Sequence, residues 1–195
     1  MTKVRGFTLI EILVGVAIGA IVALGVTELF LQSMRAQHKL YQWLSSEQAA
    51  RRTLLSFAAD LRPASYAATG AYPLESATTN TIIFYSNVDS DAPRERVRYF
   101  LNGGALKKGI TEPTGSPPVY DSTKEVVQTM VSPAVNGTTS LFSYYDQAYI
   151  GSGVPLPTPI DITKVRLVGI DLRAGDTSTP FILQTKVEIR NLKSN

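Results

Sequence analysis

The chain has 195 residues, of which 44% are hydrophobic, and its formal net charge at pH 7 is +3. This size and composition fit one domain with an accessory segment and exclude disordered and collagen-like chains. The sequence contains no cysteine, which excludes disulfides and thiolate metal sites. Two positive charges, Lys3 and Arg5, precede an apolar run. Without them the net charge falls to +1, so the charge balance gives no indication of nucleic-acid binding.

The first predicted element is an apolar helix near the N-terminus. Residues 7–31 are mostly Ile, Leu, Val, Ala and Gly, and a helix that crosses a bilayer needs about 20 such residues. No Ala-x-Ala-like cleavage site follows the run, so we expect it to remain in the mature protein as a membrane anchor. Lys3 and Arg5 favour a cytoplasmic N-terminus, although Arg35 and Lys39 on the other side weaken this asymmetry.

One acidic residue, Glu11, lies near the start of this apolar run. An ionised carboxylate in the hydrocarbon region is costly, so we expect Glu11 to have a partner. The alternative is an ordinary signal-anchor helix whose glutamate lies at the membrane interface, where the cost is small. Gly15 and Gly19 have the G-x-x-x-G spacing that lets another helix approach closely, but glycine is common in membrane helices in any case.

The helical pattern continues beyond the apolar run. Residues 32–62 contain neither proline nor glycine and are mostly good helix formers. Pro63 disfavours the helical conformation in the residue before it, so one helix is predicted from residue 7 to about residue 62. The apolar residues expected to form one stripe of its second half are Leu40, Leu44, Leu54, Ala58 and Leu61.

The chain after Pro63 reads as short strands. The strand predicted at residues 181–190 is the clearest, because apolar and polar side chains alternate along it, which indicates an antiparallel sheet with one covered face. In the strand predicted at residues 164–173, the alternation of apolar side chains changes near Val168, which predicts a bulge or a sheet edge there. The other predicted strands are residues 81–87, 95–101, 139–146, 164–173 and a segment beginning at Ala105; residues 109–123 and 151–159 are predicted loops.

The N-terminus resembles the class III signal of type IV prepilins and pilin-like proteins. The resemblance rests on the leader MTKVR, the sequence GFTLIE at residues 6–11 and the apolar helix that follows. It implies that a membrane-embedded prepilin peptidase cleaves between Gly6 and Phe7 and methylates the new amine of Phe7. It also implies a partner for Glu11, namely the N-terminal amine of a neighbouring subunit, since a buried charge must be compensated.

Two segments of the body, residues 82–109 and residues 139–172, resemble PilW-type minor pilins and the J-type pseudopilin of type II secretion. The resemblance implies a pilin-like α+β fold, in which a long N-terminal helix packs on an antiparallel β-sheet. The lack of cysteine differs from the many pilins that close a C-terminal loop with a disulfide, which argues against a major pilin. The implied division is a leader at residues 1–6, a transmembrane helix at 7–31, its amphipathic continuation at 32–62 and a β-rich domain at 63–195.

The implied function is that of a minor pilin-like subunit, at the tip or in the initiating complex of a type IV pilus. Such a subunit supports pilus assembly, with motility or DNA uptake as further roles; a pseudopilin of type II secretion is the alternative. The implied partners are prepilin peptidase, the inner membrane and other pilins or pseudopilins contacted through the N-terminal helix. The implied location is the inner membrane, with a single pass and the globular part outside the cytoplasm, and then the fibre.

Enzyme chemistry has little support in the sequence. The only histidine, His38, lies in the predicted helix, and there is no G-x-S-x-G elbow, zinc signature or phosphate loop. We therefore predict no catalytic residue, cofactor or metal. Asp89 and Asp91, with Asn87 and Glu95 nearby, suggest a calcium loop, but the glycine and terminal glutamate of an EF-hand are missing. We prefer to interpret this segment as a solvated turn.

Positive side chains lie on or beside two neighbouring predicted strands. They could bind DNA phosphates in a salt-dependent and sequence-independent way. The interpretation that we prefer is a solvated strand face with intervening acids such as Glu95. The residues of this weak basic patch are Arg94, Arg96, Arg98, Lys107 and Lys108.

Overall fold

The structure is a computed structural model that describes residues 6, 8–89 and 93–192, without the side chains of residues 38–40, 42 and 43. The chain forms two compact units, Met1–Leu44 and Ser45–Asn195, which are described separately. Phe7, with the leader charges Lys3 and Arg5, lies outside the described residues, as does Asp91.

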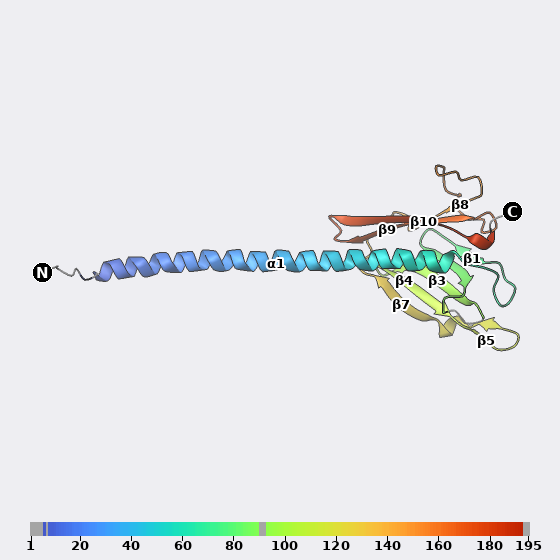
Figure 1. Ribbon diagram of the computed structural model, residues 1–195, viewed down its shortest axis with the longest axis horizontal. Coiled ribbons are helices and arrows are strands. Elements are labelled where there is room, and N and C mark those ends of the chain that lie inside the picture. Colours follow the sequence, from blue (N-terminus) through green and yellow to red (C-terminus); the bar gives the residue numbers. More distant parts are fainter. Residues whose placement is uncertain (1–5, 7, 90–92, 193–195) are drawn as a thin grey trace. The chain divides into compact units, whose positions relative to one another are not determined.

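One helix, α1, covers Leu9–Leu61 and runs through the first unit into the second (Figure 1). The long helix predicted from the sequence is confirmed, with a start two residues later than expected and an end one residue before Arg62. Residues Leu9–Gln37 form a segment long and apolar enough to cross a membrane, and none of its most apolar window is buried in the structure.

The second half of α1 supplies one side of the core of the second unit. Ala50, Leu54, Phe57 and Leu61 are buried and follow one another at intervals of three or four residues, as on one face of a helix. The predicted stripe is therefore confirmed at Leu54 and Leu61. It is wrong at Leu44, which is 40% exposed, because the buried face of α1 begins further along the helix.

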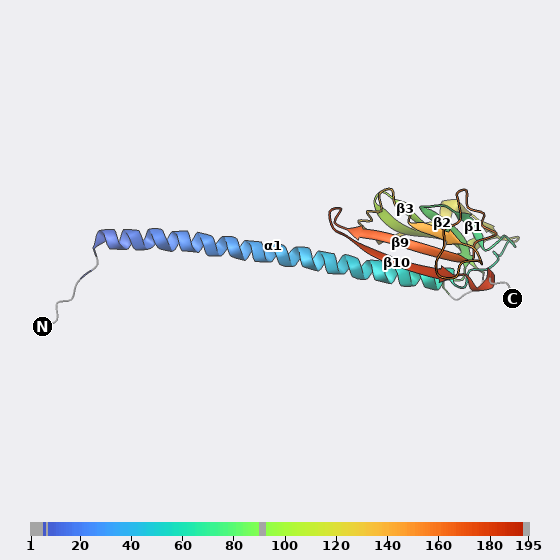
Figure 2. The same cartoon turned by 90° about the horizontal axis from the view of Figure 1, so that it is seen from above.

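The β-rich part forms two larger antiparallel sheets and a small hairpin (Figures 1 and 2). The sheets have the strand orders β1-β2-β3-β4-β7 and β10-β9-β8, and β5 pairs with β6. The strands are β1 (Leu74–Ala77), β2 (Thr81–Ser86), β3 (Glu95–Asn102), β4 (Ala105–Thr111), β5 (Pro113–Thr114), β6 (Val119–Tyr120), β7 (Val126–Val131), β8 (Phe142–Tyr145), β9 (Leu167–Gly175) and β10 (Pro180–Glu188).

Phe57 of α1 joins the two larger sheets. Its ring centroid lies 5.1 Å from that of Tyr99 on β3 and 5.6 Å from that of Phe142 on β8. Such aromatic contacts add to the free energy gained by burying the rings. The core thus lies between the C-terminal part of α1 and both sheets, and the predicted class, a long helix followed by antiparallel β-structure, is confirmed.

Some details differ from the sequence prediction. The bulge or edge expected near Val168 is wrong: β9 is the central strand of its sheet and pairs with β8 and β10 without a register shift. The predicted loop at residues 109–123 contains the end of β4 and the β5–β6 hairpin. Strands β1 and β7 were not predicted.

The end of α1 is closed by the C-terminal part of the chain. The backbone N–H of Arg190 donates to the carbonyl of Arg62 at 3.1 Å. The side-chain amide of Asn191 donates to the carbonyls of Pro63 and Ala64, also at 3.1 Å. These bonds satisfy carbonyl groups at and just beyond the end of the helix.

Candidate processing and assembly site

The first turn of α1 is closed by a capping box between Thr8 and Glu11. The backbone N–H and the hydroxyl of Thr8 donate to Glu11 Oε2 at 2.8 and 3.0 Å, and the N–H of Glu11 points back to Thr8 Oγ1 at 3.3 Å. Because the first N–H groups of a helix have no partner within the helix, these bonds stabilise its start. The carboxylate also lies at the end of the helix dipole that favours negative charge.

The capping box gives Glu11 hydrogen bonds but no counter-charge. Thr8 is neutral, and among the described residues no cationic side chain pairs with Glu11. The sequence resemblance predicts a partner for Glu11 in a neighbouring subunit and does not identify Thr8. The T-x-x-E spacing before an apolar run is the signal that could have identified Thr8.

Three glycines of this region have no role in the packing of the described chain. An added Cβ at Gly6, Gly15 or Gly19 would meet no other atom within 4 Å, apart from chain neighbours and the helix's own backbone. Gly15 and Gly19 lie one turn apart on α1. If glycine is required at these positions, the reason must lie in contacts with another molecule.

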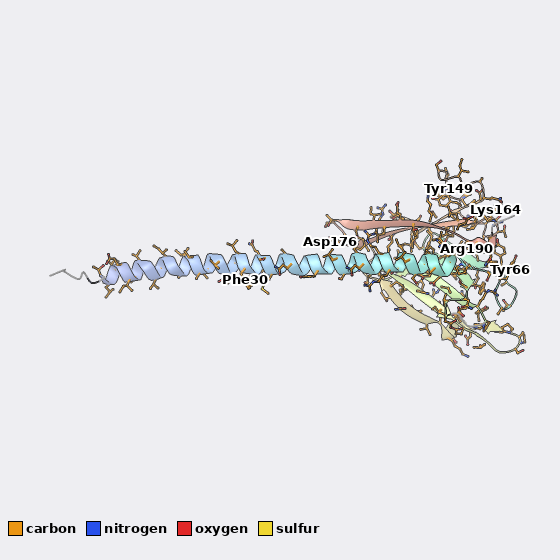
Figure 3. The ribbon with its side chains drawn as sticks, in the orientation of Figure 1. Phe30, Tyr66, Tyr149, Lys164, Asp176 and Arg190 are labelled. Atoms are coloured by element: carbon orange, nitrogen blue, oxygen red, sulfur yellow. The ribbon has the colours of Figure 1, made fainter. Side chains whose placement is uncertain are left out.

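The apolar side chains of Leu9–Gln37 are exposed on every side of the helix. Leu9 is 82% exposed and Leu24 is 72% exposed, and Figure 3 shows Phe30 extending from α1. A helix that is apolar all round is typical of a membrane span or of a helix surrounded by other helices.

Residues 1–27 match the family model described as the prokaryotic N-terminal methylation motif. The chain therefore carries the N-terminal signal of a prepilin-like protein. The match covers the leader, the site between Gly6 and Phe7, and most of the apolar run at residues 7–31. No curated protein matches the chain.

This motif supports a type IV pilin or pseudopilin precursor and indicates a structural subunit. The class III signal implies processing by prepilin peptidase and assembly with other pilins. The single N-terminal apolar helix fits a membrane-anchored pilin that later enters a fibre. Phe7 is outside the described residues, so the cleavage and methylation site is read from the sequence alone.

The five cations of the weak basic patch do not all lie on one face of the sheet. Arg96 forms an ion pair of 2.7 Å with Glu75 on β1. Lys108 forms one of 2.5 Å with Asp60 on α1, and therefore faces the helix. Arg98 is paired with Glu125 and also lies over the ring of Phe100. Arg94, which is exposed, and Lys107 form none of the described ion pairs.

The ion pair between Glu75 and Arg96 is bidentate, and the hydroxyl of Tyr85 also donates to Glu75 at 2.6 Å. Burial alone would raise the pKa of Glu75, but the hydrogen bonds from Arg96 and Tyr85 lower it below its usual value. Burial and the neighbouring carboxylate together raise the pKa of Tyr85. The guanidinium of Arg96 is therefore held by an ionised partner.

Glu125 reaches Arg98 because the strand between them carries a glycine. A Cβ at Gly109 would lie 2.2 Å from Glu125 Oε1 and 2.5 Å from its Cδ. The pairing of Arg98 with Gly109 across β3 and β4 leaves the space in which the Glu125 side chain lies. The ion pair thus connects β3 with the residue that precedes β7.

A buried polar cluster joins α1 to the larger sheet. The Tyr99 hydroxyl donates to Asp60 Oδ2 at 2.6 Å, and Lys108 pairs with the same oxygen. The side chains of Asp60 and Lys108 are each 11% exposed. Burial, followed by the charge of Asp60, raises the pKa of Tyr99, so this tyrosine remains a hydrogen-bond donor.

Proposed function

We propose that the protein is a minor pilin-like subunit, held in the inner membrane by residues 7–31 and drawn from there into the tip or initiating complex of a type IV pilus. The observation that carries this proposal is the methylation motif at residues 1–27, followed by a helix whose apolar surface is uncovered in the single chain. Lipid would cover that surface before assembly, and helices of other subunits would cover it in the fibre.

The proposed assembly step exchanges lipid contacts for helix contacts. Gly15 and Gly19 would let a neighbouring helix approach closely, since neither carries a side chain. The charge of Glu11, which Thr8 does not neutralise, would pair with the amine of Phe7 in a neighbouring subunit and fix the register between helices.

The minor position rests on the resemblance of residues 82–109 and 139–172 to PilW-type minor pilins. A pseudopilin of type II secretion is the alternative, because the same segments resemble the J-type pseudopilin. Deletion of the gene distinguishes the two: loss of surface pili with normal secretion supports the proposal, whereas loss of secreted enzymes with normal pili supports the alternative. We do not extend the proposal to DNA uptake, because three of the five patch cations are ion-paired.

The proposal is tested by the intact mass and N-terminal sequence of the protein from its native membrane. We expect a chain that begins at methylated Phe7. In the matched control, a strain without prepilin peptidase, the chain should begin before Gly6. A chain that retains its leader in cells with an active peptidase would contradict the proposal.

A further inference from the structure

Three carboxylates from separate segments meet at one end of the larger sheet. Asp89 follows β2, Glu95 begins β3, and Glu112 follows β4; each offers one oxygen within 4.8 Å of the oxygens of the other two. The register brings them together, because Arg96 pairs with Thr111, which places Glu112 beside Glu95 on the next strand. We call these residues the acidic cluster.

Glu95 is the buried member of the acidic cluster. Its exposed fraction is 0%, whereas Asp89 and Glu112 are exposed. Glu95 Oε2 accepts a hydrogen bond of 2.6 Å from the backbone N–H of Val88. Its other oxygen, Oε1, is buried and has no hydrogen-bond partner among the described residues. A buried carboxylate oxygen without a partner is costly, so it requires an explanation.

A second unpartnered oxygen belongs to the cross-strand neighbour of Glu95. Ser86 is the direct cross-strand partner of Glu95, so the two side chains share one face of the sheet with Cβ atoms about 5 Å apart. Ser86 is also 0% exposed, and its hydroxyl has no hydrogen-bond partner among the described residues. Two cross-strand neighbours thus each carry a buried oxygen without a partner, and one of them, Glu95, belongs to the acidic cluster.

We propose that the acidic cluster binds a divalent cation, Ca²⁺, with Asp89, Glu95 and Glu112 as ligands. The cluster offers only oxygen atoms, which are the ligands that Ca²⁺ prefers. Two oxygens on opposite sides of one Ca²⁺ are separated by about 5 Å, so the spacing of the cluster fits a single ion. Because Asp89 and Glu112 are exposed, water can complete the coordination shell. Asp89 and Glu112 also have other interactions, and the proposal rests on the unpartnered oxygens of Glu95 and Ser86.

The site differs from an EF-hand in the origin of its ligands. An EF-hand takes them from one loop of 12 residues, whereas these come from the ends of three neighbouring strands. A bound ion would connect the β2–β3 turn to the end of β4 and neutralise the buried charge. The second unit should therefore be more stable in calcium, whichever fibre the protein joins.

The test uses the full chain, purified in detergent, treated with a chelator and then freed of it. We expect calorimetric titration with calcium chloride to give one ion per chain. Calcium at 100 times the dissociation constant should raise the midpoint of thermal unfolding by about 5 to 10 °C. Magnesium chloride at the same concentration should have a smaller effect, because Mg²⁺ loses its water shell reluctantly.

Two variants and one control assign the site. Glu95→Gln, which keeps the size of the side chain, and Glu112→Gln, at an exposed position, should each weaken calcium binding at least tenfold. Glu188→Gln, on the exposed face of β10, should bind as the native chain does. If Glu95→Gln does not fold, the calcium affinity of Glu112→Gln alone tests the proposal. An absence of calcium binding by the native chain, or equal losses in Glu112→Gln and Glu188→Gln, would overturn the proposal.

Discussion

At the scale of single residues, Glu11 combines two properties that can be separated. It accepts the hydrogen bonds of a capping box, and it carries a charge for which the described chain provides no counter-charge. The first property acts within one chain, and the second provides a reason for contact with another chain.

Substitutions at Glu11 and Thr8 should distinguish these properties. Glu11→Gln retains an oxygen that can accept from Thr8 but removes the charge, whereas Thr8→Val removes the side-chain cap and keeps the charge. If the charge sets the register, Glu11→Gln and Glu11→Ala should both be processed normally and both enter fibres poorly. Immunoblotting of sheared fibres and of membranes measures the two steps. Wild-type incorporation of Glu11→Gln would remove the argument for charge pairing.

Thr8→Val provides the matched comparison. Loss of an N-cap costs about 1 kcal/mol, which should speed amide hydrogen exchange in the first turn of α1 roughly fivefold. We expect its incorporation into fibres to remain closer to that of the native protein than the incorporation of Glu11→Gln. Thr8→Ser, which keeps the hydroxyl, should exchange as the native chain does.

A different prediction concerns Asp60, because its charge is already paired with Lys108 within the chain. Asp60→Asn can still accept from Tyr99, but it leaves the mostly buried Lys108 without a counter-charge. Breaking a buried pair in this way costs roughly 3 kcal/mol, so the thermal midpoint of the full chain should fall by about 5 to 10 °C. Lys108→Met added to Asp60→Asn should recover part of the loss. An unchanged midpoint in Asp60→Asn would show that the pair contributes little.

At the scale of elements, Gly109 of β4 determines whether an ion pair can form between Arg98 of β3 and Glu125, the residue before β7. Glycine within a strand normally destabilises it by roughly 0.5 to 1 kcal/mol relative to alanine. Here it makes room for the Glu125 side chain, which pairs with Arg98. The usual preference for alanine should therefore be reversed at Gly109.

A double-mutant cycle tests this reversal. Gly109→Ala should destabilise the native chain by about 1 kcal/mol, because it displaces Glu125 from Arg98. In the Glu125→Ala background, the same Gly109→Ala change should be neutral or stabilising. Urea unfolding of the four proteins, followed by circular dichroism, gives the coupling free energy. A Gly109→Ala effect of the same sign and size in both backgrounds would contradict the explanation.

Elements whose signal is local were predicted well. The lack of proline and glycine in residues 32–62, with Pro63 after them, indicated that the apolar helix continues. Alternation identified β10, whose residues from Phe181 onward are alternately less and more exposed. Strand β7 was not predicted because it is an edge strand on which Val126 and Val127 are both exposed. Apolar and polar residues therefore do not alternate along it. The division of the strands into two sheets depends on pairing between distant segments, which no local pattern contains.

The same distinction applies to the candidate sites. Gly6, Glu11 and the apolar run are adjacent in the sequence, and the matching family model covers Gly6, Glu11 and most of the run. The acidic cluster combines Glu95 with Glu112, which come together only through the register of β3 and β4. The sequence suggests a calcium loop near Asp89 and Asp91, but it does not match the EF-hand pattern. That pattern takes all its ligands from one loop, so it cannot identify a site whose ligands come from the ends of three strands.

At the scale of the whole molecule, the assembly proposal makes a prediction about glycine. A larger side chain at Gly15 or Gly19 meets nothing within the described chain, so Gly15→Leu and Gly19→Leu should leave the stability and processing of the single subunit unchanged. In a fibre, the added bulk would keep neighbouring helices apart, and incorporation should fall severalfold.

Gly25→Leu is the matched control for these variants. Gly25 is equally open but lies six residues beyond Gly19 and therefore on another side of the helix. Quantification of sheared fibres against membrane-bound protein measures the effect. Equal incorporation of Gly15→Leu, Gly19→Leu and the native chain would show that no neighbouring helix approaches this face closely.

The hydrogen bond from Asn191 at the end of α1 implies that the helix is synthesised well before its end can be closed. The bond from Asn191 to Pro63 joins residues that are 128 positions apart. A ribosome therefore completes the apolar segment early, whereas the residues that close the end of its helix are among the last described in the chain. Insertion into the membrane can begin while the second unit is still open, and the end of α1 is closed only when the segment that contains Asn191 reaches it.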